Sequence, residues 1–542
     1  MANMKSKSRE EIIREDVKTL HGLGYAQQLF REMGGFSNFA ISFSIISILT
    51  GAIILYGYGL KFAGPIINTV GWPLVSLFTL AVAASMAEIA SAYPTAGGLY
   101  YWAYRLSGKT WAWVTAWLNM LGQITITAGI NMAAAIYITG LFTLLFNVPG
   151  DATVPILGAV NGWNFWLFVM IIIMIPQVLI NVMGIKLTAL LNDFSVYWHI
   201  GGVLVMALLL TIFGKYHNSL AFMFSTTQTV SPADVHATFF IGPLEVNSIM
   251  TRIIPGLGSL YASGIFAFAF VLALLQAQWT YTGYDASAHM AEETYLARMN
   301  SAWGVFLSVA VSAVVGYISL LALTNSIPPD KIADTANAPY AVLFIAQNAL
   351  QPFFANVIAV IIGVAMWLCG LSSITSMARM WFAFARDEGM PGSSYLKRVS
   401  HRWRTPANAI IVTSVIAWLI TAYSAAFSVI VSMSTTALYL AYAIPVYLNW
   451  RNKRRGQGEF TTKETAPWSL GKWGPAINVI CFSWVIVITL LFSIPPNELA
   501  GWTMIAFGVL LVIYWQVSEK RRFTGPRKAT EEELAAVEKE FA

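Results

Sequence analysis

The 542-residue sequence predicts an all-α, polytopic membrane protein with about twelve transmembrane helices. Apolar residues make up 57% of the chain and charged residues only 11%, whereas soluble domains carry about 25% charged residues. The mean hydropathy is +0.64. The apolar residues also gather into segments of roughly 20, the length that a helix needs to cross the hydrocarbon core of a bilayer.

Taken in order, the apolar segments predict twelve spans. A polar arm, residues 1–33, precedes a single transmembrane domain over residues 34–518, and a polar tail, residues 519–542, follows it. The least distinct boundary lies between Ala425 and Ser434, where eleven or thirteen spans also fit the pattern. The predicted spans cover residues 37–60, 70–92, 111–142, 163–183, 190–214, 262–284, 303–325, 353–378, 408–427, 429–449, 474–495 and 501–517.

Two segments outside the spans carry local structural signals. The longest loop, Lys215 to Tyr261, contains Pro232, Pro243 and Pro255 and is expected to be ordered, with short helices. In the tail, Thr530-Glu-Glu-Glu533 has the spacing of a capping box, which predicts a short cytosolic helix through Phe541.

The basic residues predict the orientation. An even number of spans places both termini on one side, and that side carries all but four of the 32 lysines and arginines. By the positive-inside rule both termini are expected in the cytoplasm. The polar N-terminus does not read as a cleavable signal peptide, and the net charge of +6 reflects topology rather than nucleic-acid binding. A multi-pass protein of the plasma (inner) membrane is expected. The four exceptions are Lys61, Lys215, Arg252 and Lys331.

Residues for catalysis, metal or cofactor binding are not expected. The two cysteines, Cys369 and Cys481, lie inside apolar spans and are expected to be small core residues. The sequence shows no paired His/Asp motif, no His-rich set and no phosphate-binding loop. An enzyme embedded in the membrane is therefore disfavoured.

Two spans are interrupted by residues that a continuous membrane helix does not need. The stretch Gln276–Glu293, QAQWTYTGYDASAHMAEE, places a glycine, an acid and several hydroxyls where an apolar helix is expected. A second interruption, Ile48–Ala52, lies inside the first span. Polar residues at such depth cost several kcal/mol and usually mark a solute or ion path, and paired glycine-interrupted spans point to a transporter's binding site.

The two interruptions open corresponding halves of the chain. Spans one to five (about 37–214) and six to ten (about 262–449) are expected to form two inverted repeats, because each begins with a broken span where unwound backbone would face a cavity. The last two spans, about 474–517, would then be peripheral.

Four segments resemble the amino acid–polyamine–organocation (APC) superfamily, and most of all its amino acid/choline transporter branch, which includes GABA permeases. The resemblance implies the ten-plus-two (LeuT-like) helix fold of sodium-coupled amine and amino acid transporters, with alternating access around a site at the membrane midplane. The segments are GGFSNFAISFSIISILTGAI (34–53), SMAEIASAYPTAGGLYYWA (85–103), WTYTGYDASAHMAEET (279–294) and RMWFAFARDEGMP with TPANAI (379–391 and 405–410).

The first interruption is a candidate carboxylate site. Opening a helix frees backbone N–H groups at the positive end of the following half-helix, where an anion is favoured. Thr50, Gly51, Ala52 and Ile53 are the residues expected to hold a solute carboxylate, as the resemblance also implies. The plainer alternative is that Gly51 only allows close helix packing.

The second interruption supplies the opposite chemistry. Gly283 permits unwinding, and Thr280, Tyr281 and Thr282 offer carbonyls and hydroxyls to an ammonium group. Trp279 occupies the position where the resemblance implies an aromatic that closes over bound solute, and its indole also suits a cationic group. With 20 tryptophans in the chain, simple packing is the alternative for Trp279.

Asp285 has several candidate roles. The resemblance places a glutamate there in many relatives, so the shorter Asp285 is a candidate proton acceptor, part of an inner gate, or partner for the solute amine, and a structural ion pair is equally compatible. Asn119, Gln123 and Tyr439 are further pocket candidates from other spans.

The fifth and eighth spans carry candidates for ion coupling. Many relatives that do not use sodium have a lysine about six residues after the Asn192-Asp193 position, in the place of a bound sodium ion, and here that place falls on His199. An imidazole titrates near physiological pH, so His199 is a candidate proton-linked switch, against the alternative of a hydrogen-bonded core histidine. Ser372 and Ser373 keep sodium coupling open.

Charged residues near the inner ends of the spans are candidate gates. Glu88, with Tyr93, Pro94, Gly97 and Gly98, fits the inner loop that the resemblance places after span two and that packs against the bundle. The remaining residues lie at the inner ends of spans eight and six and are expected to form ion pairs that break when the site opens inward: Arg379, Arg386, Asp387, Glu292 and Glu293.

Together these residues predict a secondary active transporter that moves a small amino acid or GABA-like amine by alternating access, linked to protons. The expected partners are a zwitterionic or cationic solute, a proton or sodium ion and the bilayer. Choline or polyamine transport, amino acid exchange and a membrane receptor that binds without translocation are the alternatives. The oligomeric state is not predicted.

Overall fold

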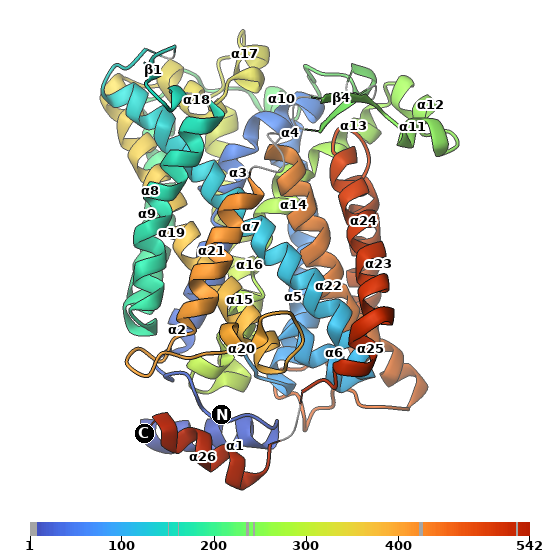
Figure 1. The fold of residues 1–542 in the computed structure, drawn as a ribbon. Coiled ribbons are helices and arrows are strands. Elements are labelled where there is room, and N and C mark those ends of the chain that lie inside the picture. The colour runs from blue at the N-terminus through green and yellow to red at the C-terminus, as the bar shows by residue number, and fades with distance from the viewer. Residues whose placement is uncertain are drawn as a thin grey trace.

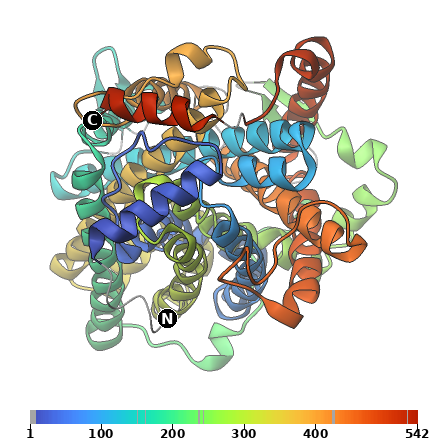
Figure 2. The same ribbon diagram turned by 90° about the horizontal axis from the view of Figure 1, so that it is seen from below.

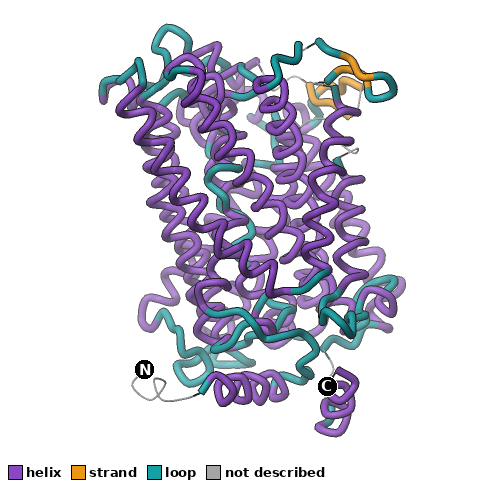
Figure 3. Tube along the Cα trace, turned by 90° about the vertical axis from the view of Figure 1, so that its left-hand side faces the viewer, coloured by secondary structure: helices purple, strands orange, loops and turns teal. Residues whose placement is uncertain are grey.

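The computed structural model describes residues 8–149, 151–160, 162–234, 238–241, 244–421, 427–526 and 529–541. Its long helices run side by side as a bundle (Figure 1). The short helices α1 and α26 lie at one end of the bundle, here called the termini end, and the strands lie at the opposite, far end (Figures 1 and 3).

Among the described residues, ten helical segments are long and apolar enough to cross a membrane, and two shorter apolar segments, 266–280 and 407–420, accompany them. These twelve coincide with the predicted spans and confirm the all-α, polytopic fold. Residues 422–426 lie outside the described residues. They include Ala425, at the span boundary for which eleven or thirteen spans also fit the sequence. The membrane-crossing elements are α2 (Gly35–Ile46), α3 (Gly51–Ile54), α4 (Tyr56–Ala63), η2 (Ile67–Gly71), α5 (Trp72–Ala92), α7 (Lys109–Leu145), α8 (Trp163–Val182), α9 (Ile185–Phe213), α13 (Phe266–Ala273), α14 (Leu275–Thr280), α15 (Ala286–His289), α16 (Ala297–Asn325), α19 (Pro352–Arg386), α21 (Ala407–Ile420), α22 (Phe427–Arg455), α23 (Gly474–Leu491) and α24 (Glu498–Tyr514).

Burial separates central helices from peripheral ones. The apolar window of α22 is 89% buried and that of the first span 83%, whereas the windows of α8 and α24 are 28% and 22% buried. Apolar surface exposed on the outer helices faces lipid in a membrane protein, so it needs no further cover. The broken first span and α22 are therefore the most central spans, and α24 lies at the edge of the bundle (Figure 1).

The far end holds the long loop between α9 and α13. It contains short helices, as predicted, and in addition an antiparallel hairpin of β3 and β4 that the sequence did not indicate. Pro243 lies outside the described residues. The elements at this end are β1 (Thr153–Val154), β2 (Gly158–Ala159), α10 (Leu220–Met223), η3 (Pro232–Asp234), β3 (Thr238–Ile241), β4 (Leu244–Asn247), α11 (Met250–Ile253), α12 (Leu257–Ala262), α17 (Ile332–Asn337) and α18 (Ala341–Ala349).

The chain termini form two helices that lie across the bundle at the termini end (Figure 2). Helix α1 (Arg9–Gly22) begins with a capping box at Ser8, and α26 (Glu531–Phe541) begins with the predicted one, in which Thr530 and Glu533 exchange backbone-to-side-chain hydrogen bonds. His21 and Glu538 join the two helices at 2.7 Å. The remaining elements are α6 (Leu99–Ser107), η4 (Ala291–Glu293), α20 (Ser393–Leu396), η5 (Gly471–Trp473), η6 (Trp515–Glu519) and α25 (Lys520–Arg522).

Candidate functional site

The first span is broken, but a few residues before the glycine that suggested the break. Helix α2 ends at Ile46, and Ser47 turns the backbone with a left-handed φ of 31°. Gly51 does not turn the chain; it begins α3. The N–H groups of Thr50 and Gly51 both donate to the carbonyl of Ser47, at 2.8 and 3.0 Å.

Two backbone donors remain at the start of α3. Among the described residues, the N–H groups of Ala52 and Ile53 donate no hydrogen bond. The turn at Ser47 separates α3 from α2, so no preceding helical turn supplies carbonyls to these first N–H groups of α3. Of the four residues expected to bind a carboxylate, these two therefore present uncommitted donors, at the positive end of the α3–α4 segment.

The second break lies between α14 and α15. Gly283 has a φ of 83°, a conformation that L-residues rarely adopt. Neighbouring helices replace the lost helix bonds: Tyr439 donates to the carbonyl of Tyr281, and Ser42 donates to that of Tyr284 at 2.8 Å. Within the described chain, no donor bonds to the carbonyls of Thr280 and Thr282. The span itself continues beyond its predicted end at residue 284, to His289.

The two breaks lie against each other. A Cβ on Gly51 would come within 2.8 Å of the Thr280 Cα atom, so glycine is required there for close packing as well as for any role in binding. A small cavity of about 10 Å³, the space of one water molecule, lies between the breaks, and all of its lining residues are buried. It is closed to solvent, and no charged side chain lines it. The lining consists of Ile45, Ile46, Thr50, Gly51, Ile126, Ile130, Trp279, Thr280 and Thr282.

Trp279 forms one wall of the cavity. Its indole N–H donates to Ser434 of α22 at 3.1 Å, and its ring meets Phe427 edge-on with centroids 5.5 Å apart. The ring is therefore held in place by α22. Both interpretations of Trp279, solute cover and packing, are compatible with this position.

Six residues expected at the binding site do not line the cavity: Gln123, Ala52, Ile53, Tyr281, Gly283 and Asp285. Tyr281 points to α5, where its hydroxyl lies 2.7 Å from that of Ser76. Gln123 donates its amide to Asp285 at 2.9 Å, and the Asp285 carboxylate faces away from the cavity into its own polar cluster.

Asp285 lies in a buried cluster that the sequence predicted only in part. Its Oδ2 atom accepts hydrogen bonds from Asn119 and Gln123, both at 2.9 Å, and lies 3.1 Å from His289 Nε2. Its Oδ1 atom accepts from Tyr442 at 2.8 Å. With four partners the carboxylate has little capacity left for a solute amine, which favours the proton-binding and structural roles over direct solute binding.

The sequence interpretation missed His289 and Tyr442. His289 follows Asp285 by four residues, the spacing that brings two side chains together on one helical face. That signal was present, but His289 lies beyond the predicted end of the sixth span. Tyr442 on α22 carried no local signal.

His199 joins the first break. Its Nε2 atom lies 2.7 Å from the Ser47 hydroxyl, which is 2.6 Å from that of Thr50, and its Nδ1 atom lies 2.8 Å from the carbonyl of Ser195. A neutral imidazole satisfies both contacts, because Nδ1–H donates to the carbonyl and the serine hydroxyl donates to Nε2. The geometry thus accounts for His199 as a neutral, hydrogen-bonded residue.

The hydroxyls considered as sodium ligands already have protein partners. Ser372 donates to Asn192 Oδ1 and contacts the carbonyl of Leu368. The Ser373 hydroxyl lies 2.6 Å from that of Thr127. Both serines therefore connect α19 to its neighbours, α9 and α7.

Two bidentate ion pairs join α19 to η4 at the termini end. Arg379 donates to both oxygens of Glu293 at 2.9 and 3.1 Å, and Arg386 donates to both oxygens of Glu292 at 2.9 and 2.8 Å. These two pairs are named the gate pairs below. The Arg379–Glu293 pair is completely buried.

The N-terminal arm covers the gate pairs. Arg31 donates to the carbonyls of Ala291 and Thr294, and the backbone of Met33 bonds to the carbonyl of Glu293 at 2.9 Å. The Arg386 guanidinium lies 3.9 Å above the ring of Tyr25. The arm therefore holds η4 in place as part of the closed end.

Two acids next to Arg386 differ in charge behaviour. Burial would raise the pKa of Glu292, but the paired Arg386 guanidinium outweighs burial and holds that pKa below its ordinary value. Burial raises the pKa of Asp387 to about 6, although Arg386 and hydrogen bonds from Tyr25 and Tyr100 oppose the rise. Glu292 is thus fixed as an anion, whereas Asp387 titrates near physiological pH.

Glu88 is not part of the gate pairs. It accepts from Lys453 of α22 at 2.8 Å and lies 3.2 Å from the hydroxyl of Ser469. It connects α5 to the inner end of α22, some distance along the chain from the other gate candidates.

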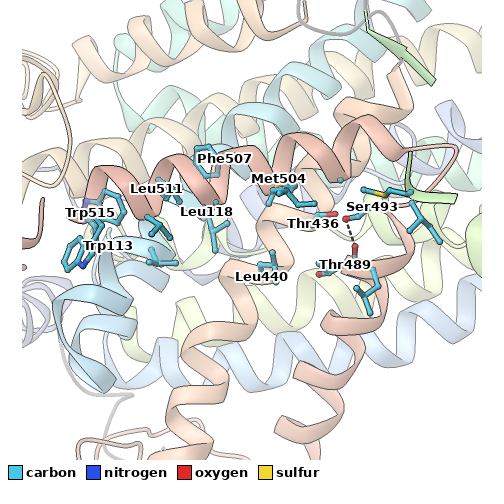
Figure 4. A pocket seen from close by; sticks show the side chains of 18 of the residues that line it. Trp113, Leu118, Thr436, Leu440, Thr489, Ser493, Met504, Phe507, Leu511 and Trp515 are labelled. Carbon is cyan, nitrogen blue, oxygen red and sulfur yellow. Dashed lines mark hydrogen bonds between the residues drawn. The ribbon is translucent and has the colours of Figure 1, made fainter. Parts of the chain in front are cut away.

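A much larger cavity, of about 670 Å³, lies between α7, α22, α23 and α24. Trp113 and Trp515 lie at one end and Thr489 and Ser493 at the other (Figure 4). Several lining residues, such as Leu490, are more than half exposed, so the cavity opens on the outer face of the bundle. It does not reach the two breaks.

Broken helices that pack against each other around a closed cavity, inside a multi-pass bundle, define the chain as a membrane carrier. The chain belongs to the amino acid permease family, whose model matches residues 33–515. It is 34% identical to amino-acid permease BAT1 of Arabidopsis thaliana over 94% of this chain and 95% of that protein, and 33% identical to the BAT1 homologue of rice over 94% of each. A Candida albicans protein, provisionally named a polyamine transporter, is 24% identical over 97% of this chain and 91% of its own length.

Proposed function

We propose that this protein is a secondary transporter that carries a small amino acid or a GABA-like amino acid across the membrane by alternating access. The family and its relatives support a membrane carrier of amino acids or amines. The observation that carries the choice of solute is the chemistry of the two facing breaks. Within the described chain, the N–H groups of Ala52 and Ile53, directly after the cavity-lining Gly51, donate no hydrogen bond, and the carbonyls of the cavity-lining Thr280 and Thr282 accept none.

The chemistry of the cavity favours a zwitterion. The N–H groups of Ala52 and Ile53 suit a carboxylate, and the carbonyls of Thr280 and Thr282 suit an ammonium group, while Trp279 covers both. Because the backbone supplies partial charges only, a solute with one charge of each sign is matched without a buried countercharge.

Choline and polyamines fit the cavity less well. A relative named for polyamines supports their transport, but no acidic side chain lines this cavity, and Asp285 is already saturated by four partners. A dication in an uncharged cavity would pay a large desolvation cost.

The remaining features of the proposal concern topology and coupling. We place both termini in the cytoplasm of a plasma membrane, because the basic residues gather at the termini end. Residues 34–518 form the transport domain, with inverted repeats over about 37–214 and 262–449 and peripheral helices over about 474–517. Transport is linked to protons, and the gate pairs close the cytoplasmic side.

Uptake by purified protein in liposomes tests the proposal directly. Radiolabelled amino acids or GABA are expected to accumulate inside proteoliposomes and to compete with one another, since one cavity serves all of them. Proton and sodium gradients are imposed separately, and the proton gradient is expected to drive uptake. Uptake of choline alone would contradict the choice of solute, and binding without accumulation or exchange would indicate a receptor.

The pH profile of a His199→Ala variant tests the alternative switch. Because neutral His199 is fully satisfied by Ser47 and Ser195, we expect the variant to lose stability but to keep the wild-type dependence of uptake on pH. The measurement is initial uptake from pH 5 to 8 by liposomes that carry equal amounts of protein. A flattened profile would instead identify His199 as a proton-linked switch.

A further inference from the structure

Asp285 and His289 form a buried pair at the second break. The carboxylate Oδ2 lies 3.1 Å from His289 Nε2, one helical turn away, and both side chains have zero exposure. The other ring nitrogen, Nδ1, lies 3.0 Å from the carbonyl oxygen of Ala96, in the loop between α5 and α6. Both nitrogens of one imidazole therefore face oxygen acceptors.

This arrangement determines how many protons the pair holds. A neutral imidazole carries one N–H, and a carbonyl such as that of Ala96 cannot donate. Both contacts are hydrogen bonds only if His289 is an imidazolium, or if Asp285 carries the proton and donates it to Nε2. In either case the pair holds one more proton than a carboxylate next to a neutral histidine does, so the closed structure is the protonated form of the pair.

Among the described residues, the other groups that face the pair carry no charge that would compensate for that proton. Helix α7 contributes the amides of Asn119 and Gln123, and α22 contributes Tyr442. Helix α2 contributes Ser42 and Asn38, which form hydrogen bonds with Ser287 of α15. The charged groups on the remaining neighbours have partners of their own. Arg379 of α19 pairs with Glu293, and Arg386 pairs with Glu292. Arg298 of α16 donates to the carbonyls of Ser91 and Thr465.

The pair is connected to the gate through one residue. The carbonyl of Ala96 faces His289, and the N–H of the same residue donates to Glu292 Oε1 at 3.0 Å. Glu292 is in turn held by both guanidinium nitrogens of Arg386. The loop segment around Ala96 is therefore fixed on one side by the protonated pair and on the other by a gate pair.

We propose that Asp285 and His289 together form the proton-coupling site of this transporter, and that Ala96 transmits its protonation to the gate. When the proton leaves for water at the termini end, the pair gains a net charge of −1 and the neutral imidazole keeps a single N–H. That N–H keeps its hydrogen bond to the Asp285 carboxylate, so the carbonyl of Ala96 loses its hydrogen-bond donor. The loop segment around Ala96, which also binds Glu292, is then released. This inference rests on the proposed function, since it names the coupling site of the same carrier.

Reconstituted protein with the membrane potential clamped tests the inference. A gradient of one pH unit stores about 1.4 kcal/mol per proton, so wild-type protein coupled to one proton is expected to concentrate its solute about tenfold. His289→Gln is expected to reduce that ratio to about one, because an amide that cannot be protonated replaces the imidazole and only one partner of the pair remains ionisable. Exchange of labelled for unlabelled solute, which needs no net proton movement, is expected to continue in the variant.

His217→Gln is the matched control, since it makes the same change at an exposed loop histidine. It is expected to retain tenfold accumulation. Asp285→Asn is the second variant if His289→Gln does not fold, and it is expected to lose accumulation in the same way because only one partner remains ionisable.

The outcomes separate this inference from the proposed function. If wild-type protein moves no amino acid or amine, the proposed function is wrong. If it moves solute without an accompanying proton, or if either folded variant still accumulates solute tenfold, the proton site is wrong and the carrier function stands. Loss of accumulation with continued exchange supports the site.

Discussion

Replacing Gly283 with alanine is expected to abolish transport while leaving a membrane-inserted protein. At a φ of 83° an L-residue costs about 1–2 kcal/mol, and the added Cβ would lie 2.3 Å from Cγ2 of Ile45, an overlap of the kind that costs about 1–3 kcal/mol more. Ile45 lines the cavity just before the first break, so the displacement reaches both breaks. Uptake in liposomes is the measurement, and a loss of at least about tenfold follows from a distortion of that size.

The control is Gly201→Ala on α9, where a Cβ would meet no atom within 4 Å. This variant is expected to transport like wild type. Ile45→Ala in the Gly283→Ala background removes the overlap but not the unfavourable φ, so it should restore only part of the activity. Normal uptake by Gly283→Ala at normal expression and thermal stability would show that the second break is not part of the transport path.

The broken helices could be predicted because membrane helices obey few rules. Apolar length gives the spans, and a glycine within a polar stretch, as at Gly283, contradicts a continuous helix strongly enough to be recognised. The first break was placed less well. Its turn is made by Ser47, a residue that enters the left-handed region only because its surroundings hold it there, and no sequence rule identifies such a residue in advance.

The polar cluster could be predicted only where partners are close in sequence. Asn119 and Gln123 are four residues apart on α7 and converge on Asp285, and His289 is four residues from Asp285, so helical spacing alone relates each pair. That Tyr442 completes the cluster, and that Tyr281 points instead to Ser76, depends on how α22 and α5 pack against the second break. Such packing between helices cannot be predicted from the residues that are neighbours of Tyr442 and Tyr281 in the sequence.

The charged residues at the span ends illustrate the same limit. The sequence suggested ion pairs between the ends of spans six and eight, and the structure contains the two gate pairs there. The sequence did not indicate that Glu88 would pair with Lys453. Lys453 is 365 residues from Glu88 in the chain, so only the fold brings them together.

The Arg379–Glu293 gate pair leads to the second large expected effect. Arg379→Ala would leave the Glu293 carboxylate buried without its partner, which typically costs about 3–5 kcal/mol. That cost falls on the closed form, because opening the termini end would hydrate the carboxylate. We therefore expect Arg379→Ala to lower thermal stability and to shift the population toward the open form. Arg379→Ala with Glu293→Gln removes both charges and should recover much of the stability, while the termini end still opens more readily than in wild type.

Cys369 provides a native reporter for that opening. It is buried beside the first break, where its thiol contacts the carbonyl of Ile45. In a Cys481→Ser background, a membrane-impermeant thiol reagent applied from the termini side should label Cys369 faster in both gate variants than in wild type. Lys397→Ala is the matched control, because it breaks the exposed Lys397–Glu388 pair, and surface pairs of that kind contribute less than about 1 kcal/mol. Equal labelling of Cys369 in wild type and in both gate variants would show that this pair does not hold the termini end closed.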